Sequence, residues 1–274
     1  MSGAAAGMAA GQPGGAADEA DAAPPPIRVR GLRTAFGEHV VHEDLDLDVK
    51  QGEILAVVGG SGSGKSVLLN TILGLKEPDG GAVEIFGRDL AEEETRDELE
   101  RRAGVLFQNG ALYSALTVLE NVEAPFLEHV ELPAAFVRDL ARLKIRLVGL
   151  EASAGDKRPA DLSGGMRKRA GMARAIALDP DILFLDEPTA GLDPVGAASF
   201  DTLVRDLRDA MGLTVFMITH DLDTIYAICD RVAVLADKHV VAAGPVAEME
   251  RSDHPWIKEY FGGPRGRAAR EKQS

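Results

Sequence analysis

The sequence predicts an α/β fold into which a mainly helical subdomain is inserted. Apolar runs of strand length recur along the chain, one of them leads directly into a Gly-rich stretch, and amphipathic helical patterns lie between them. Residues from about 90 to 180 read differently, because they are mostly helical in pattern and carry charged runs such as AEEETRDELERR. We therefore expect an α/β core, a helical subdomain at about 90–180, and a return to α/β structure after it.

The chain begins with a segment of unusual composition. Residues 1–26 are almost all Ala, Gly and Pro, interrupted by three acidic residues. Such a segment buries too little apolar surface to offset the entropy of an ordered chain, so we predict a disordered leader. We expect one domain over residues 27–262. Residues 263–274 contain several basic residues and are predicted to form a mobile tail.

Strand patterns start at Ile27. The runs IRVRGLRTAF and LDLDVKQG alternate apolar and polar residues, as half-buried strands do. The run EILAVVGG is apolar almost throughout, as a strand buried on both faces should be. Further strand-like runs, in chain order, are AVEIFG, AGVLFQ, DILFLD, TVFMITH, RVAVLAD and HVVAAG. The clearest helical pattern is GAASFDTLVRDLRDAM, in which apolar residues recur at helical spacing.

Charge and composition exclude several classes of function. The net charge of −14 disfavours a nucleic-acid partner, because no positive field favours the phosphate backbone. The single cysteine, Cys229, has no partner for an internal disulfide and fits a reducing compartment. No apolar run approaches the roughly 20 residues of a membrane-spanning helix, and no signal-peptide pattern is visible. We expect a cytosolic protein that reaches a membrane only through a partner.

The Gly-rich stretch GGSGSGKS predicts a phosphate site. It fits the pattern G-x-x-x-x-G-K-[ST], with a buried strand before it and the helical pattern SVLLNTILGL after it. Its glycines let backbone N–H groups point at phosphate oxygens, while Lys65 neutralises the β- and γ-phosphates and Ser66 offers a hydroxyl to Mg²⁺. The flanking strand and helix disfavour the alternative of a Gly-rich turn with a chance lysine. The predicted nucleotide-binding residues here are Gly59, Gly60, Ser61, Gly62, Ser63, Gly64, Lys65 and Ser66.

The buried strand DILFLDEP ends in two carboxylates. Asp186 lies at its carboxyl end, where α/β sheets place their ligands, and is expected to hold Mg²⁺ through water. Glu187 follows, and we expect it to polarise the attacking water. A solvated pair of carboxylates at a strand end is the alternative, which the phosphate pattern makes less favoured. ATP and Mg²⁺ are therefore the expected ligands.

A second anion site is indicated by LSGGMRKR, in which a serine and two glycines open a helix. LSGGM is very similar to the signature motif of ABC-type ATPases, although the commonest family form has Gln in place of Met166. The resemblance implies a P-loop NTPase fold of the ABC type, with a mainly helical subdomain inserted. It also implies a head-to-tail homodimer in which Ser163, Gly164 and Gly165 contact the γ-phosphate in the partner subunit. The cations Arg167–Arg169 are expected at a solvated or phosphate-facing edge.

Other positions resemble further motifs of that family. Gln108, after AGVLF, matches the Q-loop glutamine and is expected to sense Mg²⁺ and the water. Asp193, in AGLDP, matches the D-loop and is expected to cross the dimer interface. His220, after TVFMIT, matches the switch histidine that contacts the γ-phosphate. Phe36, before Gly37, is in the position of the ring that stacks on adenine; a core phenylalanine is the alternative.

Three segments narrow the resemblance. LFQNGALYSALTVLENV, LSGGMRKRAGMARAIALDP and LADKHVVAAG look like segments of the ATPases that serve Mce-type lipid transporters, the Mla phospholipid system. This implies an ATP hydrolase that powers phospholipid transport between the inner and outer membranes. The implied partners are an integral-membrane permease, an Mce-domain protein and a STAS-domain subunit, with no direct contact with lipid. The implied location is the cytoplasmic face of the bacterial inner membrane. The alternatives are an importer ATPase for amino acids or ions and, less favoured, a soluble ABC ATPase without a transport role.

Overall fold

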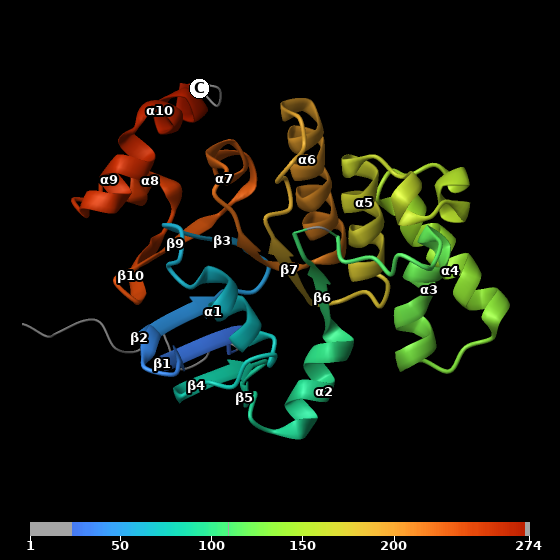
Figure 1. Cartoon of the computed structure of the whole chain (residues 1–274), viewed down its shortest axis with the longest axis horizontal. Helices are drawn as coiled ribbons and strands as arrows, with labels where there is room; N and C mark the ends of the chain where they lie inside the picture. Colours follow the sequence, from blue (N-terminus) through green and yellow to red (C-terminus); the bar gives the residue numbers. More distant parts are fainter. Residues whose placement is uncertain (1–23, 109, 272–274) are drawn as a thin grey trace, which may run out of the picture.

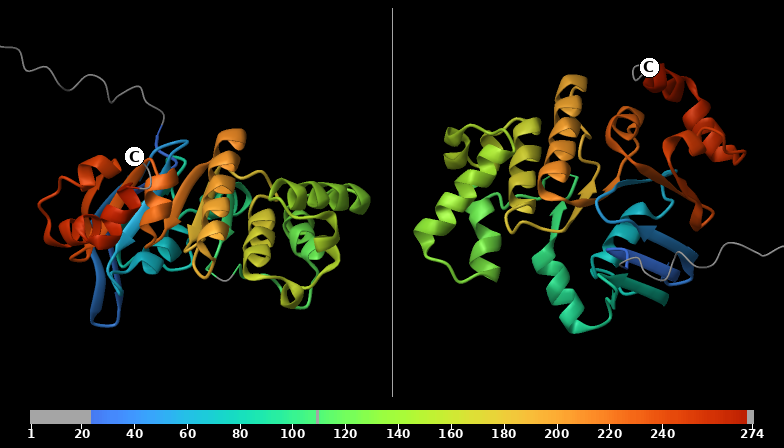
Figure 2. Two further views of the ribbon diagram at one scale, coloured as in Figure 1. Left: turned by 90° about the horizontal axis from the view of Figure 1, so that it is seen from above. Right: turned by 180° about the vertical axis from the view of Figure 1, so that it is seen from behind.

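A computed structural model of the protein describes residues 24–108 and 110–271. Figure 1 shows a small antiparallel sheet beside a central sheet, with helices α3 to α5 beyond one end of the central sheet and helices α8 to α10 at the other. The same separation is visible from above and from behind in Figure 2. The α/β class with a helical insertion, predicted from the sequence, is therefore confirmed.

The antiparallel sheet has the strand order β2-β1-β4-β5. The predicted strand at Ile27 is β1 (Ile27–Phe36), and its hairpin partner β2 (His39–Val49) begins earlier than its alternating pattern indicated. Strand β4 (Gly80–Ile85) pairs with the other edge of β1, and the short β5 (Arg88–Asp89) pairs with β4. The turn between β1 and β2 contains Gly37 at φ 60°, a left-handed conformation that suits glycine.

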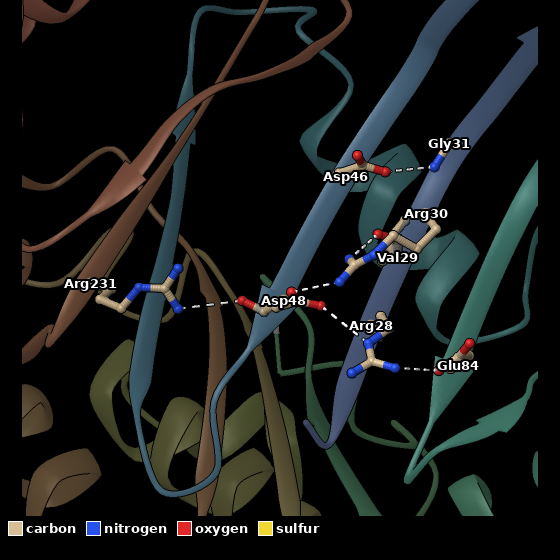
Figure 3. Close-up of polar contacts among 8 residues, drawn as sticks. All are labelled: Arg28, Val29, Arg30, Gly31, Asp46, Asp48, Glu84 and Arg231. Carbon is tan, nitrogen blue, oxygen red and sulfur yellow. Dashed lines mark hydrogen bonds and ion pairs between the residues drawn. The ribbon is translucent and has the colours of Figure 1, made fainter. Parts of the chain in front are cut away.

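A row of ion pairs crosses this sheet and reaches the central one (Figure 3). Asp48 of β2 pairs with Arg30 at 2.7 Å and with Arg28 at 3.7 Å, and Arg28 continues to Glu84 of β4 at 3.3 Å. Arg231 of the central sheet donates to the carbonyl oxygen of Asp48 at 3.4 Å. Exposed pairs of this kind each contribute about 0–1 kcal/mol, so we expect them to set register more than stability.

The central sheet has the strand order β10-β9-β3-β8-β7-β6. Strands β6, β7, β8, β3 and β9 run parallel, and β10 is antiparallel to β9. Their bounds are β3 (Ile54–Gly59), β6 (Ala103–Leu106), β7 (Ile182–Asp186), β8 (Thr214–Ile218), β9 (Arg231–Ala236) and β10 (His239–Gly244). The carboxyl ends of parallel strands share one edge of a sheet, so the segments after β3, β6, β7 and β8 meet there.

Both faces of the central sheet are buried, with successive residues on opposite sides. In β7, Phe184 packs with α1 (Lys65–Ile72) and the antiparallel sheet, whereas Leu185 packs with the helices on the other face. Those helices include α5 (Gly164–Ala175) and α6 (Pro194–Met211). A third cluster joins β3 and β9 to the C-terminal helices. It includes residues of α7 (Leu222–Ile228), α8 (Val246–Met249), α9 (Pro255–Gly262) and α10 (Pro264–Glu271).

The helical subdomain is narrower than the predicted range of about 90–180. Helix α2 (Glu93–Arg102) leads directly into β6, which pairs with β7 in the central sheet. The helices beyond the end of the sheet are α3 (Val118–His129) and α4 (Ala134–Leu147), followed by short 3₁₀ turns. Charged residues dominate α2, which explains why its pattern could not be separated from the helices that follow β6.

The two chain ends were also assigned from composition. Residues 1–23 of the predicted disordered leader lie outside the described residues, as do residues 272–274 of the tail. The mobile tail predicted from residue 263 differs from the structure, in which residues 264–271 form α10. Helix α10 contacts α7 and α9, and its Ala269 is buried in the third cluster. Within the described residues, no helix has the length and apolarity needed to cross a membrane.

Candidate functional site

The segment between β3 and α1 has the geometry of a phosphate loop. Gly62 and Gly64 have φ values of 77° and 98°, which are costly for any residue with a Cβ. Gly59 also needs to be glycine, because a Cβ there would lie 2.3 Å from the carbonyl oxygen of Leu235. Helix α1 begins directly after Gly64, so its first free N–H groups face the same space. The predicted strand–loop–helix context is present.

Lys65 lies folded over this loop. Its Nζ donates to the carbonyl oxygens of Gly59 and Gly60, at 2.9 and 3.0 Å, and lies 3.4 Å from the Ser63 hydroxyl. Burial lowers the pKa of Lys65 below its usual value, and the carboxylates of Glu187 and Asp186 oppose that shift. The ammonium group therefore lies close enough to the end of β7 for its charge to act on both carboxylates.

The structure adds one histidine that the sequence analysis left without a role. His42 of β2 is fully buried, and its Nδ1 lies 2.8 Å from the Thr34 hydroxyl. A Cβ on Gly64 would lie 2.5 Å from its Nε2, so the imidazole closes the back of the phosphate loop. Burial lowers the pKa of His42 to about 4, which keeps the ring neutral at neutral pH. The position of His42 beside Gly64 depends on the pairing of β1 with β2, which the local sequence pattern does not reveal.

The two carboxylates after β7 differ in their surroundings. Burial raises the pKa of Asp186, the adjacent Glu187 raises it further, and Lys168 and Lys65 oppose the change. Glu187 has a φ of 48°, a left-handed conformation that is rare for a residue other than glycine. One of its carboxylate oxygens lies 2.7 Å from Nδ1 of His220. The structure therefore brings together the predicted water-polarising carboxylate and the predicted switch histidine.

Lys168 is the main correction to the sequence analysis. The stretch Arg167–Arg169 was predicted to form a solvated or phosphate-facing edge, but Lys168 is only 5% exposed. Its Nζ donates to the carbonyl oxygen of Glu187 at 2.8 Å and to that of Gln108. Three successive cations read as a charged surface in the sequence, whereas α5 turns the middle one inward between two loops.

Gln108 follows β6 and has an exposed side chain at the edge shared by the phosphate loop and β7. The carbonyl groups of its loop are held by cations of α5. Lys168 holds the Gln108 carbonyl, and Arg174 donates to those of Ala111, at 2.8 Å, and Gly110, at 3.3 Å. The carbonyl groups of Gln108, Gly110 and Ala111 are thus held, while the Gln108 side chain is left accessible to a ligand.

Ser163, Gly164 and Gly165 lie apart from the phosphate loop of their own chain. The Ser163 hydroxyl caps α5 by accepting from the backbone N–H of Met166 at 3.2 Å, and a Cβ on Gly164 would meet open space. Helices α5 and α1 are separated along the long axis of the molecule in Figures 1 and 2. In the described residues, no hydrogen bond joins Ser163–Gly165 to residues 59–66.

Two further predicted residues lie at exposed positions. Asp193 caps α6, accepting from the backbone N–H groups of Val195 at 3.1 Å and Gly196 at 2.9 Å, and Val195 beside it is 79% exposed. Phe36 ends β1 and is 59% exposed, so the alternative of a core phenylalanine is wrong. The ammonium of Lys76 lies over that ring, 5.1 Å from its centroid. An exposed ring of this kind is accessible for stacking.

The oxygen donors at this edge fit Mg²⁺. A serine hydroxyl (Ser66), a carboxylate (Asp186) and an amide (Gln108) are hard ligands of the kind that Mg²⁺ prefers. Burial and the neighbouring Glu187 both raise the pKa of Asp186, and a divalent cation would oppose both effects. A cleft of about 390 Å³ opens beside this site and is lined by Glu187, His220 and two alanines of α10, among others.

Comparisons with known proteins all identify ATP-binding proteins of ABC transporters as similar to this chain. A family model described as ABC transporter matches residues 42–190. The "Intermembrane phospholipid transport system ATP-binding protein MlaF" of Haemophilus influenzae is 36% identical over 239 residues, which cover 86% of this chain and 90% of that protein. The "Probable ribonucleotide transport ATP-binding protein mkl" of Mycobacterium leprae is 39% identical over 243 residues, covering 87% of this chain and 69% of that protein.

The fold matches solved ATP-binding cassettes as well. The cassette MJ0796, in a dimeric post-hydrolysis state bound to ADP and phosphate, superposes with a TM-score of 0.73 at 29% identity. The match covers 80% of this chain and 98% of that one.

Proposed function

Because the chain belongs to the ABC transporter family, as an ATP-hydrolysing subunit of a transporter, we propose that it powers phospholipid transport between two membranes. The proposal has two parts. The first is the division of work among the residues of the nucleotide site. The second is the cargo, which in this proposal does not contact the chain directly.

The contact between Glu187 and His220 carries the first part. A carboxylate 2.7 Å from an imidazole, beside a phosphate loop, is suited to orient a water molecule for attack on the γ-phosphorus. Lys65 and the loop from Gly59 to Ser66 hold the phosphates, and Phe36 stacks on adenine. Ser66, Gln108 and Asp186 would hold Mg²⁺, which would supply positive charge to the β- and γ-phosphates when bound.

The separation of α5 from α1 supports a composite site made by two subunits. In this proposal Ser163, Gly164 and Gly165 of one subunit complete the site on the phosphate loop of its partner, and Asp193 crosses between them. ATP then joins the subunits, because its γ-phosphate gains donors from the partner in the closed dimer alone. Hydrolysis removes that bridge and the dimer opens.

The relative from Haemophilus influenzae supports a phospholipid cargo. Its similarity extends over 90% of its own length, so the likeness is not confined to a short motif. We propose the corresponding assembly: a homodimer of this chain, two permease subunits, an Mce-domain protein and a STAS-domain subunit, at the cytoplasmic face of the inner membrane. The relative named for ribonucleotide transport favours a second cargo, ribonucleotides, since its identity is slightly higher over less of its length.

Capture of the complex tests the cargo. The tagged full chain is pulled from detergent-solubilised native membranes, its partners are identified by mass spectrometry, and the ATPase activity of the captured complex is measured with phospholipid vesicles or with ribonucleotides. We expect the tagged chain to capture a permease together with an Mce-domain protein. We also expect phospholipid vesicles to stimulate the ATPase activity of the captured complex. Stimulation by ribonucleotides would replace the cargo, and capture without a permease would contradict the proposed assembly.

A further inference from the structure

Lys168 is a buried cation, and burial of a positive charge is energetically unfavourable. Its side chain projects from α5 and is buried. Burial lowers the pKa of Lys168, and the carboxylates of Asp186 and Glu187 oppose that shift. A buried ammonium is strongly destabilising unless its N–H groups find acceptors. Here it finds two backbone carbonyls, of Gln108 and Glu187, from segments about eighty residues apart in sequence.

The backbone at Glu187 needs such a contact. A left-handed φ of 48° is unfavourable at a residue other than glycine and persists where the surroundings hold it. The N–H of Glu187 donates to the carbonyl oxygen of Ile218 at 2.9 Å, and the carbonyl oxygen of Glu187 accepts from Lys168 at 2.8 Å. The peptide groups on both sides of Cα are therefore fixed, which sets the direction of the Glu187 side chain.

Lys168 itself lies on α5, the helix that begins with the LSGGM motif. Lys168 belongs to α5, which begins at Ser163, and the same ammonium holds the loop that carries Gln108. One side chain thus joins three parts of the site: the helix proposed to face the partner's nucleotide, the glutamine loop, and the water-polarising carboxylate. Arg174 of the same helix holds Gly110 and Ala111 but has no contact with Glu187 among the hydrogen bonds of the described residues.

We propose that Lys168 is a positioning residue for ATP hydrolysis, which holds the backbone of Glu187 so that its carboxylate meets His220 and the attacking water. This inference rests on the proposed role of Glu187 in hydrolysis. Lys168 does not touch the nucleotide in this account, so its loss should slow turnover without weakening the binding of ATP.

The chain offers a matched control for this test. Lys144 of α4 is also a buried lysine, 4% exposed, and its Nζ pairs with Asp179 away from the phosphate loop. Lys168→Met and Lys144→Met therefore remove the same group from equally buried positions. Both are prepared in the full chain, the folded fraction is measured, and the ATP dissociation constant and kcat are determined per folded protein.

We expect Lys168→Met to lower kcat about 10- to 100-fold, as misplacement of a reacting group does, with the dissociation constant within about twofold of wild type. Lys144→Met should leave both constants near wild type. Lys168→Arg retains a cation with several N–H donors and should recover most of the lost kcat. If Lys168→Met fails to fold, Lys168→Gln replaces it, with a smaller fall in kcat expected at unchanged affinity.

Wild-type kcat in folded Lys168→Met or Lys168→Gln, or an equal fall in Lys144→Met, would overturn the inference. A double variant separates this failure from that of the proposed function. If Lys168 acts through Glu187, adding Lys168→Met to Glu187→Gln should cause little further loss. Wild-type turnover in Glu187→Gln alone would instead refute the role of Glu187, and with it the inference that rests on it.

Discussion

The central sheet and the helical subdomain differ in how they treat apolar side chains. In the central sheet, β3, β7 and β8 bury nearly every residue on both faces. The segment from residue 113 to 147 is different, because it contains most of the large apolar side chains that are exposed in the described chain. They are Tyr113, Leu127, Val130, Leu132, Phe136, Leu143 and Leu147. The sheet has its packing partners within the chain, whereas these seven side chains remain largely exposed in the described residues.

The comparison predicts the largest effects at the edge of the central sheet. Glu187→Gln retains the size of the side chain but removes the carboxylate that faces His220, so kcat should fall about 10²- to 10⁴-fold. Binding of ATP should remain, since the phosphate loop is untouched. Steady-state hydrolysis and equilibrium binding of ATP measure the two effects. Loss of binding together with turnover would place Glu187 in nucleotide binding and not in the chemical step.

A second test uses two phenylalanines of neighbouring helices within the helical subdomain. Phe126 of α3 is 5% exposed, whereas Phe136 of α4 is 52% exposed. Phe126→Ala should lower the free energy of unfolding by about 3–5 kcal/mol, and Phe136→Ala by less than about 0.5 kcal/mol. Urea unfolding of the two variants checks this. Equal losses would mean that the exposed surface belongs to the core of the isolated protein.

The phosphate loop itself tolerates little change. Gly64→Ala combines a φ of 98° with a Cβ that lies 2.5 Å from Nε2 of His42, which is fully buried and has little room to move. We expect a loss of about 1–3 kcal/mol in the free energy of unfolding and weaker binding of ATP. Gly37→Ala, at a turn where a Cβ meets nothing within 4 Å, is the control for φ alone. Equal effects of the two variants would show that the contact with His42 does not matter.

A smaller effect on stability, dependent on pH, is expected at Asp201. Asp201 of α6 is buried, accepts from the Thr224 hydroxyl, and has a pKa raised from 3.8 to about 7, chiefly by burial, with smaller effects of Asp221 and Asp223. The folded state thus binds the Asp201 proton more tightly than the unfolded state. Stability should fall as pH rises from about 4 to 7 and change little from this group above 7.

Asp201→Asn removes that dependence. At pH 8 the variant should be more stable than the wild type by about 2–4 kcal/mol, and at pH 4 the two should be nearly equal. Unfolding in urea at the two pH values measures the difference. A variant that is less stable than the wild type at pH 8 would contradict the account of Asp201.

Sequence reasoning located the parts of the site that depend on local pattern. The phosphate loop, Asp186 and Glu187 follow from a buried strand, its end and a glycine pattern, all of which lie within a few residues. His42 and Lys168 were missed, since each acts through a neighbour that is distant in sequence. His42 reaches Gly64 through strand pairing, and Lys168 reaches Glu187 because α5 turns it inward. The local sequence around Lys168 looks like that of a surface cation, and the local sequence around His42 looks like that of a core histidine.

In the proposed dimer, one chain carries two phosphate-binding elements that serve different subunits. The most direct measurement is the mass of the Glu187→Gln chain in solution, by analytical ultracentrifugation, with ATP and with ADP. The account predicts a dimer with ATP, a monomer with ADP, and loss of the ATP-dependent dimer when Ser163→Ala is added. A chain that remains a monomer with ATP, or a dimer that is unaffected by nucleotide and by Ser163, would contradict it.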